Sequence, residues 1–494
     1  MDFLFLLIKS LSRSEKRYFK IYAKRHVLGE ENNYILLFDI LVKMEEYNEE
    51  KLLESLDGHR MTKRIEVAKT YLYKLIIKAM RAYRSGKTIE VQLSEMLETI
   101  DFLFEKKLYP QAYAQLKKAK KMAADFEKLT LLPELLHWEE RLMAAEFFSK
   151  NRLKDLQELK DKQQKVLHDL LTINEFWQLD ATLYFKYHRE GIAQDQKEWK
   201  VLEQLLAHPI LKMPETDLPF QAKRLKLKTY STWYFLKRDF EKCYPIVNDL
   251  VMLLEEKPAM LKKEPLEYIQ SLNNLLNMTQ VLGKSDESKF LLAKLESLLK
   301  KDVYKKMEQV QLRLFESFYY HQMNLHRQQK TYKDGLRYLK DIEKGMQQFS
   351  GKMNPVGQLM ICFHVFQLCY GAQQWNDALD WLDRILQKKN TLIHQEIILI
   401  SQLTLPIVTF KLYGNNIDTQ RAIRQVYKFL SKRKKTYKLE KTALDFIKKL
   451  TQTKNKKDLK IELKWLDSEL NQSTSEERLF AYFDFKEWIQ SELN

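Results

Sequence analysis

The sequence predicts an all-α protein made of helical hairpins that repeat along the chain. Three observations support this fold class. The chain of 494 residues contains only 11 Gly and 10 Pro, too few for the many tight turns of a strand-rich protein. Its apolar residues recur at steps of three and four, as on one face of a helix. One residue pattern also returns at intervals of 43 to 47 positions in the second half of the chain.

Composition narrows the classes of function. The formal net charge of +17 suits an acidic partner such as nucleic acid or an anionic membrane, although surplus lysine also serves solubility alone. The three cysteines, Cys243, Cys362 and Cys369, argue against a disulfide framework and fit a reducing cytosol. The apolar run at residues 3–8 is too short for a signal peptide or a membrane span. We therefore expect a soluble, cytoplasmic protein.

Residues 1–90 are predicted to form an N-terminal helical cap domain that lacks the repeat. Ser12 and Glu15 have the spacing of a capping box, so a helix is expected to begin there. Further helices are expected at 33–46, 48–56 and 62–84.

The last two of these helices have the order of a DNA-reading helix-turn-helix. Lys74, Lys78 and Arg81 form a stripe along the second one. The turn at 57–61 is longer than the usual three to four residues, which favours a cap that opens the repeats.

Residues 91–435 are predicted to consist of the repeat. Each copy has a bulky residue, a small residue three positions later, and apolar residues seven and ten positions after the first. The copies are Tyr109/Ala112/Leu116/Ala119, Phe240/Cys243/Val247/Leu250, Tyr332/Gly335/Leu339/Ile342 and Trp375/Ala378/Leu382/Ile385, with a degenerate copy at Ser285/Ser288/Leu292/Leu295. The gap from 109 to 240 is 131 residues, so two more copies are expected near 153 and 197. The residues standing there are Leu153/Leu156 and Trp199/Leu202/Leu206.

The clearest hairpin covers residues 358–389. Gly371 lies where a helix C-cap would fall, and Trp375 begins the second helix. The turns keep the same interval: Gly283, Gly371 and Gly414 are 88 and 43 residues apart, with polar turns at 327–330 and 237–239 and Gly191 further back.

These copies resemble the second helix of a tetratricopeptide repeat, most clearly at Gly371, Trp375, Ala378, Leu382 and Ile385. In that family the small residue lets neighbouring helices approach closely. The resemblance covers roughly residues 91 to 430 and departs in its period, 43 to 47 here against the family's 34. It implies a right-handed α-α superhelix of about eight hairpins with helical caps at both ends. It also implies a concave surface that binds extended peptides or helices of other proteins.

The charge is concentrated near the C-terminus. Residues 411–460 carry 16 Lys/Arg and 4 Asp/Glu, whereas residues 461–494 carry 3 basic and 8 acidic residues. Residues 436–494 are expected to form C-terminal capping helices. A basic helix is predicted at 418–435, and its candidate anion- or partner-binding residues are Arg421, Arg424, Lys428, Lys432, Arg433, Lys434 and Lys435. This helix is interpreted either as a phosphate-binding face or as a solvated outer helix.

No motif nominates an active site. The sequence has no GxGxxG, GxxxxGK[ST], GxSxG or HExxH run and no Cys-His zinc spacing. We therefore expect no catalysis, no metal site and no cofactor. Weak candidates for a peptide groove are the aromatic pairs Tyr319/Tyr320, Trp233/Tyr234 and Trp375/Trp381.

Two functions follow from these patterns. The first is a non-catalytic protein–protein interaction scaffold that binds a peptide or helix of a partner protein on the concave surface. The alternative is a nucleic-acid-associated regulator that contacts phosphate through the basic 418–435 helix or the N-terminal helices.

Overall fold

The computed structural model describes residues 2–26, 33–59, 61–86, 88–146, 153–190, 203–387 and 395–431, together with 200, 445–446, 449, 461–466 and 468. Every regular element in these residues is a helix, so the all-α fold class is confirmed. None of the described helices is both long and apolar enough to cross a membrane. The chain divides into two compact units, residues 1–178 with 208–223 and residues 179–207 with 224–494.

The first 86 residues form a hydrophobic core of their own. Its elements are α1 (Phe3–Ser10), α2 (Arg13–His26), α3 (Asn33–Lys43), α4 (Glu49–Glu54), a 3-10 turn (Thr62–Arg64) and α5 (Ile65–Arg84). The capping box is confirmed: Ser12 N donates to Glu15 Oε2 at 2.8 Å, and Glu15 N donates to Ser12 Oγ at 3.3 Å. The rings of Phe19 and Phe38 meet in the centre, with centroids 4.5 Å apart.

A buried lysine ties three helices of this core together. Lys69 on α5 donates to Tyr47 Oη at 2.7 Å, Glu66 Oε1 at 2.8 Å and Glu49 Oε1 at 3.2 Å. Burial alone lowers the pKa of a lysine, but the hydrogen bonds to Glu66, Tyr47 and Glu49 together raise the pKa of Lys69 above its usual value. Asp2, which caps α1 through Phe5 N, lies 3.5 Å from the same Nζ.

The next helices are α6 (Ile89–Glu105), α7 (Tyr109–Asp125), a 3-10 turn (Leu129–Leu131), α8 (Leu132–Ala145) and α9 (Leu153–Glu190). The repeat copy predicted at Leu153 and Leu156 is wrong, because α9 runs unbroken for 38 residues and Leu153 is 86% exposed. Its sequence contains no Gly or Pro that would end a helix. The next predicted copy begins at Trp199 which, like the Gly191 turn, lies outside the described residues.

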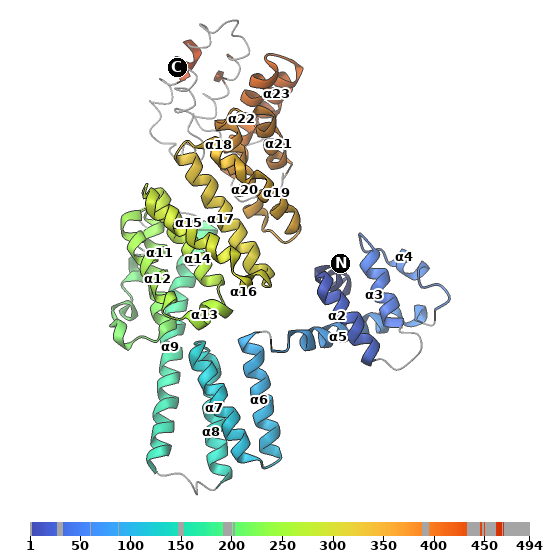
Figure 1. The fold of residues 1–494 in the computed structure, drawn as a ribbon, viewed down its shortest axis with the longest axis vertical. Coiled ribbons are helices and arrows are strands. Elements are labelled where there is room, and N and C mark those ends of the chain that lie inside the picture. Colours follow the sequence, from blue (N-terminus) through green and yellow to red (C-terminus); the bar gives the residue numbers. More distant parts are fainter. Residues whose placement is uncertain are drawn as a thin grey trace. The chain divides into compact units, whose positions relative to one another are not determined.

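The remaining described helices follow one another along the chain (Figure 1). They are α11 (Phe220–Leu236), α12 (Phe240–Glu255), α13 (Pro258–Lys263), α14 (Leu266–Val281), α15 (Ser285–Lys300), α16 (Asp302–Lys305), α17 (Glu308–Gln328), α18 (Tyr332–Gly335), α19 (Leu339–Gln348), α20 (Pro355–Gly371), α21 (Trp375–Leu386), α22 (Gln395–Tyr413) and α23 (Ile417–Ser431), with 3-10 turns at Pro209–Lys212, Glu215–Asp217 and Leu336–Tyr338. Contacts run in order from α12 to α14, α15, α17, α20, α21, α22 and α23. This sequential packing is typical of helical repeats.

The repeated sequence pattern marks packing positions. The small residue at the fourth position is buried in every copy, at Ala112, Cys243, Ser288, Gly335 and Ala378. The residue at the eleventh position is buried as well, at Ala119, Leu250, Leu295, Ile342 and Ile385. Leu339 is only half-buried, in a copy whose helix is interrupted by the 3-10 turn before α19.

The turns inside the hairpins share one geometry. Two positions before each copy stands a residue in the left-handed conformation: Lys107 (φ 58°), Arg238 (φ 56°), Gly283 (φ 70°), Lys330 (φ 57°) and Gln373 (φ 61°). The next amide donates to a carbonyl five residues back, as from Gln374 N to Cys369 O at 2.9 Å, which is the closure of a Schellman motif. The predicted C-cap at Gly371 is therefore misplaced: Gly371 is the last residue of α20, and the left-handed residue is Gln373.

Neighbouring hairpins are also joined by side chains about one period apart. Arg313 Nη2 donates to Gln270 Oε1 at 2.6 Å, and Tyr304 Oη donates to the Leu261 carbonyl at 2.6 Å, each across 43 residues. Further links of this kind are Arg224–Glu267, Tyr244–Glu287, Lys352–Glu308 and Arg384–Glu343. Side-chain contacts between neighbouring hairpins therefore recur at the same interval as the sequence pattern.

Candidate functional site

A hollow of about 220 Å³ opens between α9, α11, α12 and α14. Its lining combines aliphatic and aromatic side chains with hydroxyls and amides. The lining residues are Tyr184 on α9, Ser231, Thr232, Phe235 and Leu236 on α11, Cys243 and Val247 on α12, and Asn274, Asn277 and Met278 on α14. A surface of this kind accommodates an apolar side chain and offers hydrogen bonds around it.

Helix α14 presents a row of carboxamides beside this hollow. The row consists of Gln270, Asn273, Asn274, Asn277 and Gln280, at steps of three, one, three and three. The opposite face of α14 is buried through Tyr268, Leu275 and Thr279, which fixes the direction of the row, and Gln280 at the end of the row is buried as well. Gln270 Nε2 donates to Asn274 Oδ1 at 2.9 Å. Asn277 has no hydrogen bond to another described residue, so its donor and acceptor are available to a ligand.

A buried histidine connects the carboxamide row to α17. The ring nitrogens Nδ1 and Nε2 of His321 lie 2.9 Å from Gln280 Oε1 and 3.1 Å from Asn273 Oδ1. Gln280 Nε2 donates to the His321 carbonyl at 2.8 Å, which fixes the orientation of that amide. Complete burial, reinforced by the nearby His364, lowers the pKa of His321 to about 3. A neutral imidazole donates from only one nitrogen, so we infer that Asn273 turns its NH₂ group toward the other.

The same polar layer continues to α20. The ring of His364 packs edge-on against Tyr320, with centroids 4.7 Å apart. Burial, and to a lesser extent the charge of Arg327, lower the pKa of His364 to about 3. Both histidines are therefore neutral at physiological pH. They hold α14, α17 and α20 in register and position the carboxamide row.

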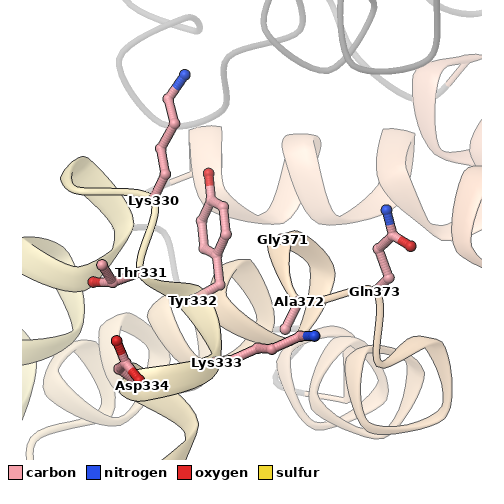
Figure 2. A pocket seen from close by; sticks show the side chains of 8 residues that line it. All are labelled: Lys330, Thr331, Tyr332, Lys333, Asp334, Gly371, Ala372 and Gln373. Carbon is pink, nitrogen blue, oxygen red and sulfur yellow. The ribbon is translucent and has the colours of Figure 1, made fainter. Parts of the chain in front are cut away.

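A second, shallower hollow of about 410 Å³ lies at the turns before α18 and α21 (Figure 2). Lys330, Lys333, Asp334 and Gln373 surround it with polar groups, together with Thr331, Tyr332, Gly371 and Ala372. A Cβ atom on Gly371 would lie 2.4 Å from Cδ1 of Tyr332, so the glycine leaves room for that ring. This hollow therefore lies at the packing contact between Gly371 and Tyr332 of two neighbouring hairpins.

The predicted basic helix is present in part. Arg421, Arg424 and Lys428 are exposed along α23, opposite a face buried through Ala422, Ile423, Val426 and Leu430. Arg421 already pairs with Asp418 at 3.2 Å. Lys432, Arg433, Lys434 and Lys435 lie outside the described residues, as does most of the predicted capping segment 436–494. The structure therefore places three of the seven candidates on one face.

The aromatic candidates fare differently. Trp233 and Trp381 are buried, 5% and 3% exposed, so they are core residues. The aromatic residues at the first hollow are instead Tyr184 and Phe235, which are 59% and 40% exposed. Sequence reasoning missed both. Tyr184 lies near the C-terminal end of α9, between the two copies expected near 153 and 197, and its neighbours in the hollow come from helices further along the chain.

Neither the comparison with protein-family models nor the search of curated proteins finds a match to this chain.

Proposed function

We propose that this protein is a helical-repeat scaffold that binds a segment of a partner protein without catalysis. In this proposal the repeats are tetratricopeptide-like and form a right-handed superhelix of about eight hairpins in a cytoplasmic protein. The recurring left-handed turn residues and the contacts about one period apart support a regular repeat. In a scaffold of this kind, the first helices of successive hairpins line up and form a long surface for a partner.

The single observation that carries the proposal is the hollow beside the α14 carboxamides. Phe235, Val247 and Met278 offer an apolar seat for one side chain of the partner. Asn277 at its edge can pair with a peptide group, because a carboxamide supplies one acceptor and two donor hydrogens. An extended peptide meets both requirements, with alternate side chains entering the hollow and main-chain groups reaching the amides.

The test is a selection of peptides from a random library against the intact protein, followed by affinity measurement with synthetic copies. We expect enriched peptides to carry a large apolar residue. Asn277→Ala should weaken their binding about fivefold to tenfold, as for the loss of one or two hydrogen bonds. Thr232→Trp, which fills the hollow, should abolish binding.

The matched control is Asn376→Ala, the same change at an exposed position of α21. It should leave peptide affinity unchanged. The proposal is contradicted if selection enriches no peptide, or if Asn277→Ala and Thr232→Trp bind the selected peptides as the control does.

A further inference from the structure

Helices α2 and α5 of the N-terminal core carry a set of cations that nothing described neutralises. The set is Arg13, Arg17, Lys24 and Arg25 on α2 and Lys74, Lys78, Arg81 and Arg84 on α5. All eight residues are exposed, and none forms an ion pair with another described residue. On α5 the stripe Lys74, Lys78 and Arg81 faces away from the core side marked by Leu72, Ile76 and Ala79.

The two helices meet at a pair of tyrosines. The rings of Tyr18 and Tyr83 have centroids 4.9 Å apart. Arg17 and Arg84 are the chain neighbours of these tyrosines, so cations flank the joint on both helices. Tyr73, one residue before Lys74, is 42% exposed. Cations and flat aromatic rings therefore occur together on this part of the domain.

Charges of opposite sign are separated within the domain. Residues 70–86 contain four basic residues, all exposed, and no acidic residue, whereas residues 45–57 contain six acidic residues and one basic residue. The two segments meet at the buried Lys69, which binds Glu49 and Glu66. A surface that serves solubility alone mixes the two signs.

We infer that the exposed cations of α2 and α5 bind the phosphate backbone of a nucleic acid. Lysine and arginine neutralise successive phosphates, and the exposed ring of Tyr73 offers a surface on which an unpaired base stacks. This surface has more uncommitted cations than α23, where Arg421 is already held by Asp418. The inference is independent of the peptide-binding proposal and concerns a different part of the chain.

The test measures binding of the full-length protein to fluorescent single-stranded RNA and duplex DNA probes of about 20 nucleotides or base pairs, between about 50 and 200 mM salt. We expect affinity to fall steeply with salt for at least one probe. The triple variant Lys74→Gln, Lys78→Gln, Arg81→Gln should lower that affinity at least tenfold. It should also reduce the slope of log affinity against log salt by about two to three.

The matched control is Lys117→Gln, Lys118→Gln, Lys121→Gln on α7, which removes the same charge from exposed positions of another helix. It should bind as the unmodified protein does, and unchanged circular dichroism of both triples shows that they fold. Equal loss in the two triples would mean an effect of net charge alone and would overturn the inference. Unchanged binding in the α5 triple would also overturn it. Phosphatidylserine vesicles are tested in parallel, and a loss seen only with the vesicles would likewise contradict nucleic-acid binding.

Discussion

The repeats and the N-terminal helices use charge in opposite ways. In the repeats, cations pair with acids about one period away, as Arg384 does with Glu343 at 3.2 Å and Lys352 with Glu308. On α2, Lys20 pairs with Asp39 of α3 at 2.6 Å, but the eight exposed cations described above on α2 and α5 have no acidic partner among the described residues. Surface pairs contribute little stability each, so those in the repeats mainly fix the register of neighbouring hairpins. The difference shows that the net charge of +17 is not spread evenly over the protein.

The two regions also differ in what they bury. The repeats bury His321 and His364 as neutral rings, with pKa values lowered to about 3. The N-terminal core buries Lys69 as a cation and surrounds it with Glu66, Tyr47 and Glu49. Both arrangements avoid the free-energy cost of removing an unpaired charge from water. The histidines stay neutral, and the lysine is surrounded by opposite charges and hydrogen bonds that replace its hydration.

The largest expected difference between the two regions is in how mild acid changes the free energy of unfolding. Between pH 7 and 5 the unfolded chain protonates His321 and His364 near their usual pKa of 6.5, while the folded repeats keep them neutral. The unfolded state then binds more protons, so the free energy of unfolding falls as pH falls. We expect a loss of about 2 kcal/mol for each histidine by pH 5. All eight tryptophans lie between residues 138 and 488, so urea unfolding followed by tryptophan fluorescence reports this loss without the N-terminal core.

A His364→Phe variant sharpens this prediction. It keeps an aromatic ring against Tyr320 and should remove about half of the pH dependence. An equal dependence in the variant and the unmodified protein would show that these histidines are not the cause.

The second-largest expected effect is the loss of stability when one methyl group is added at Gly371. In Gly371→Ala the new Cβ would lie 2.4 Å from Cδ1 of Tyr332, so the ring and two hairpins must shift. We expect a loss of about 2–3 kcal/mol in the free energy of unfolding seen by tryptophan fluorescence. Ala372→Ser, at the neighbouring half-buried position, is the control and should change stability little.

In the N-terminal core the corresponding test is Lys69→Met. The substitution removes the cation from the acid cluster, but the Glu49 and Glu66 side chains are 54% and 75% exposed and can regain water. We therefore expect a moderate loss of about 2 kcal/mol. Hydrogen exchange in α1, α4 and α5 should accelerate while the repeats stay unchanged. Lys74→Met, at an exposed position of the same helix, should have no such effect.

The smallest effect is a stabilisation. Gln373 has φ of 61°, a conformation that costs an ordinary residue about 1 kcal/mol relative to glycine. Gln373→Gly should therefore raise the free energy of unfolding of the repeats by up to about 1 kcal/mol. Gly283→Ala, at the equivalent turn with φ of 70°, should lower it by a similar amount. A destabilised Gln373→Gly variant would count against a shared turn geometry.

The sequence patterns correctly predicted features that depend on interactions within a single helix. The Ser12/Glu15 cap, the helices α2 to α5 and the buried small residues such as Ala378 all follow from spacing within one helix. Helix α1 was not predicted. The turn residue was misplaced because four of the five left-handed positions, Gln373 among them, are not glycine.

Long-range features were beyond sequence reasoning. The partners of Lys69 come from three separate segments, and the hollow combines Tyr184 with residues about 50 and 90 positions further on. No pattern within one helix announces either site. The basic stripes on α23 and α5 were visible in the sequence, and the pairing of Arg421 with Asp418 lies within one helix. That the α5 cations have no acidic partner on another described helix appears only when the helices are placed in space.

The central claim is that a partner peptide occupies the hollow beside the α14 carboxamides. Hydrogen exchange of the full-length protein with and without a selected peptide tests it most directly. We predict slower exchange in α11 and α14 on addition of the peptide, and no such change in the Thr232→Trp variant. Protection confined to other helices, or equal protection in that variant, would contradict the claim.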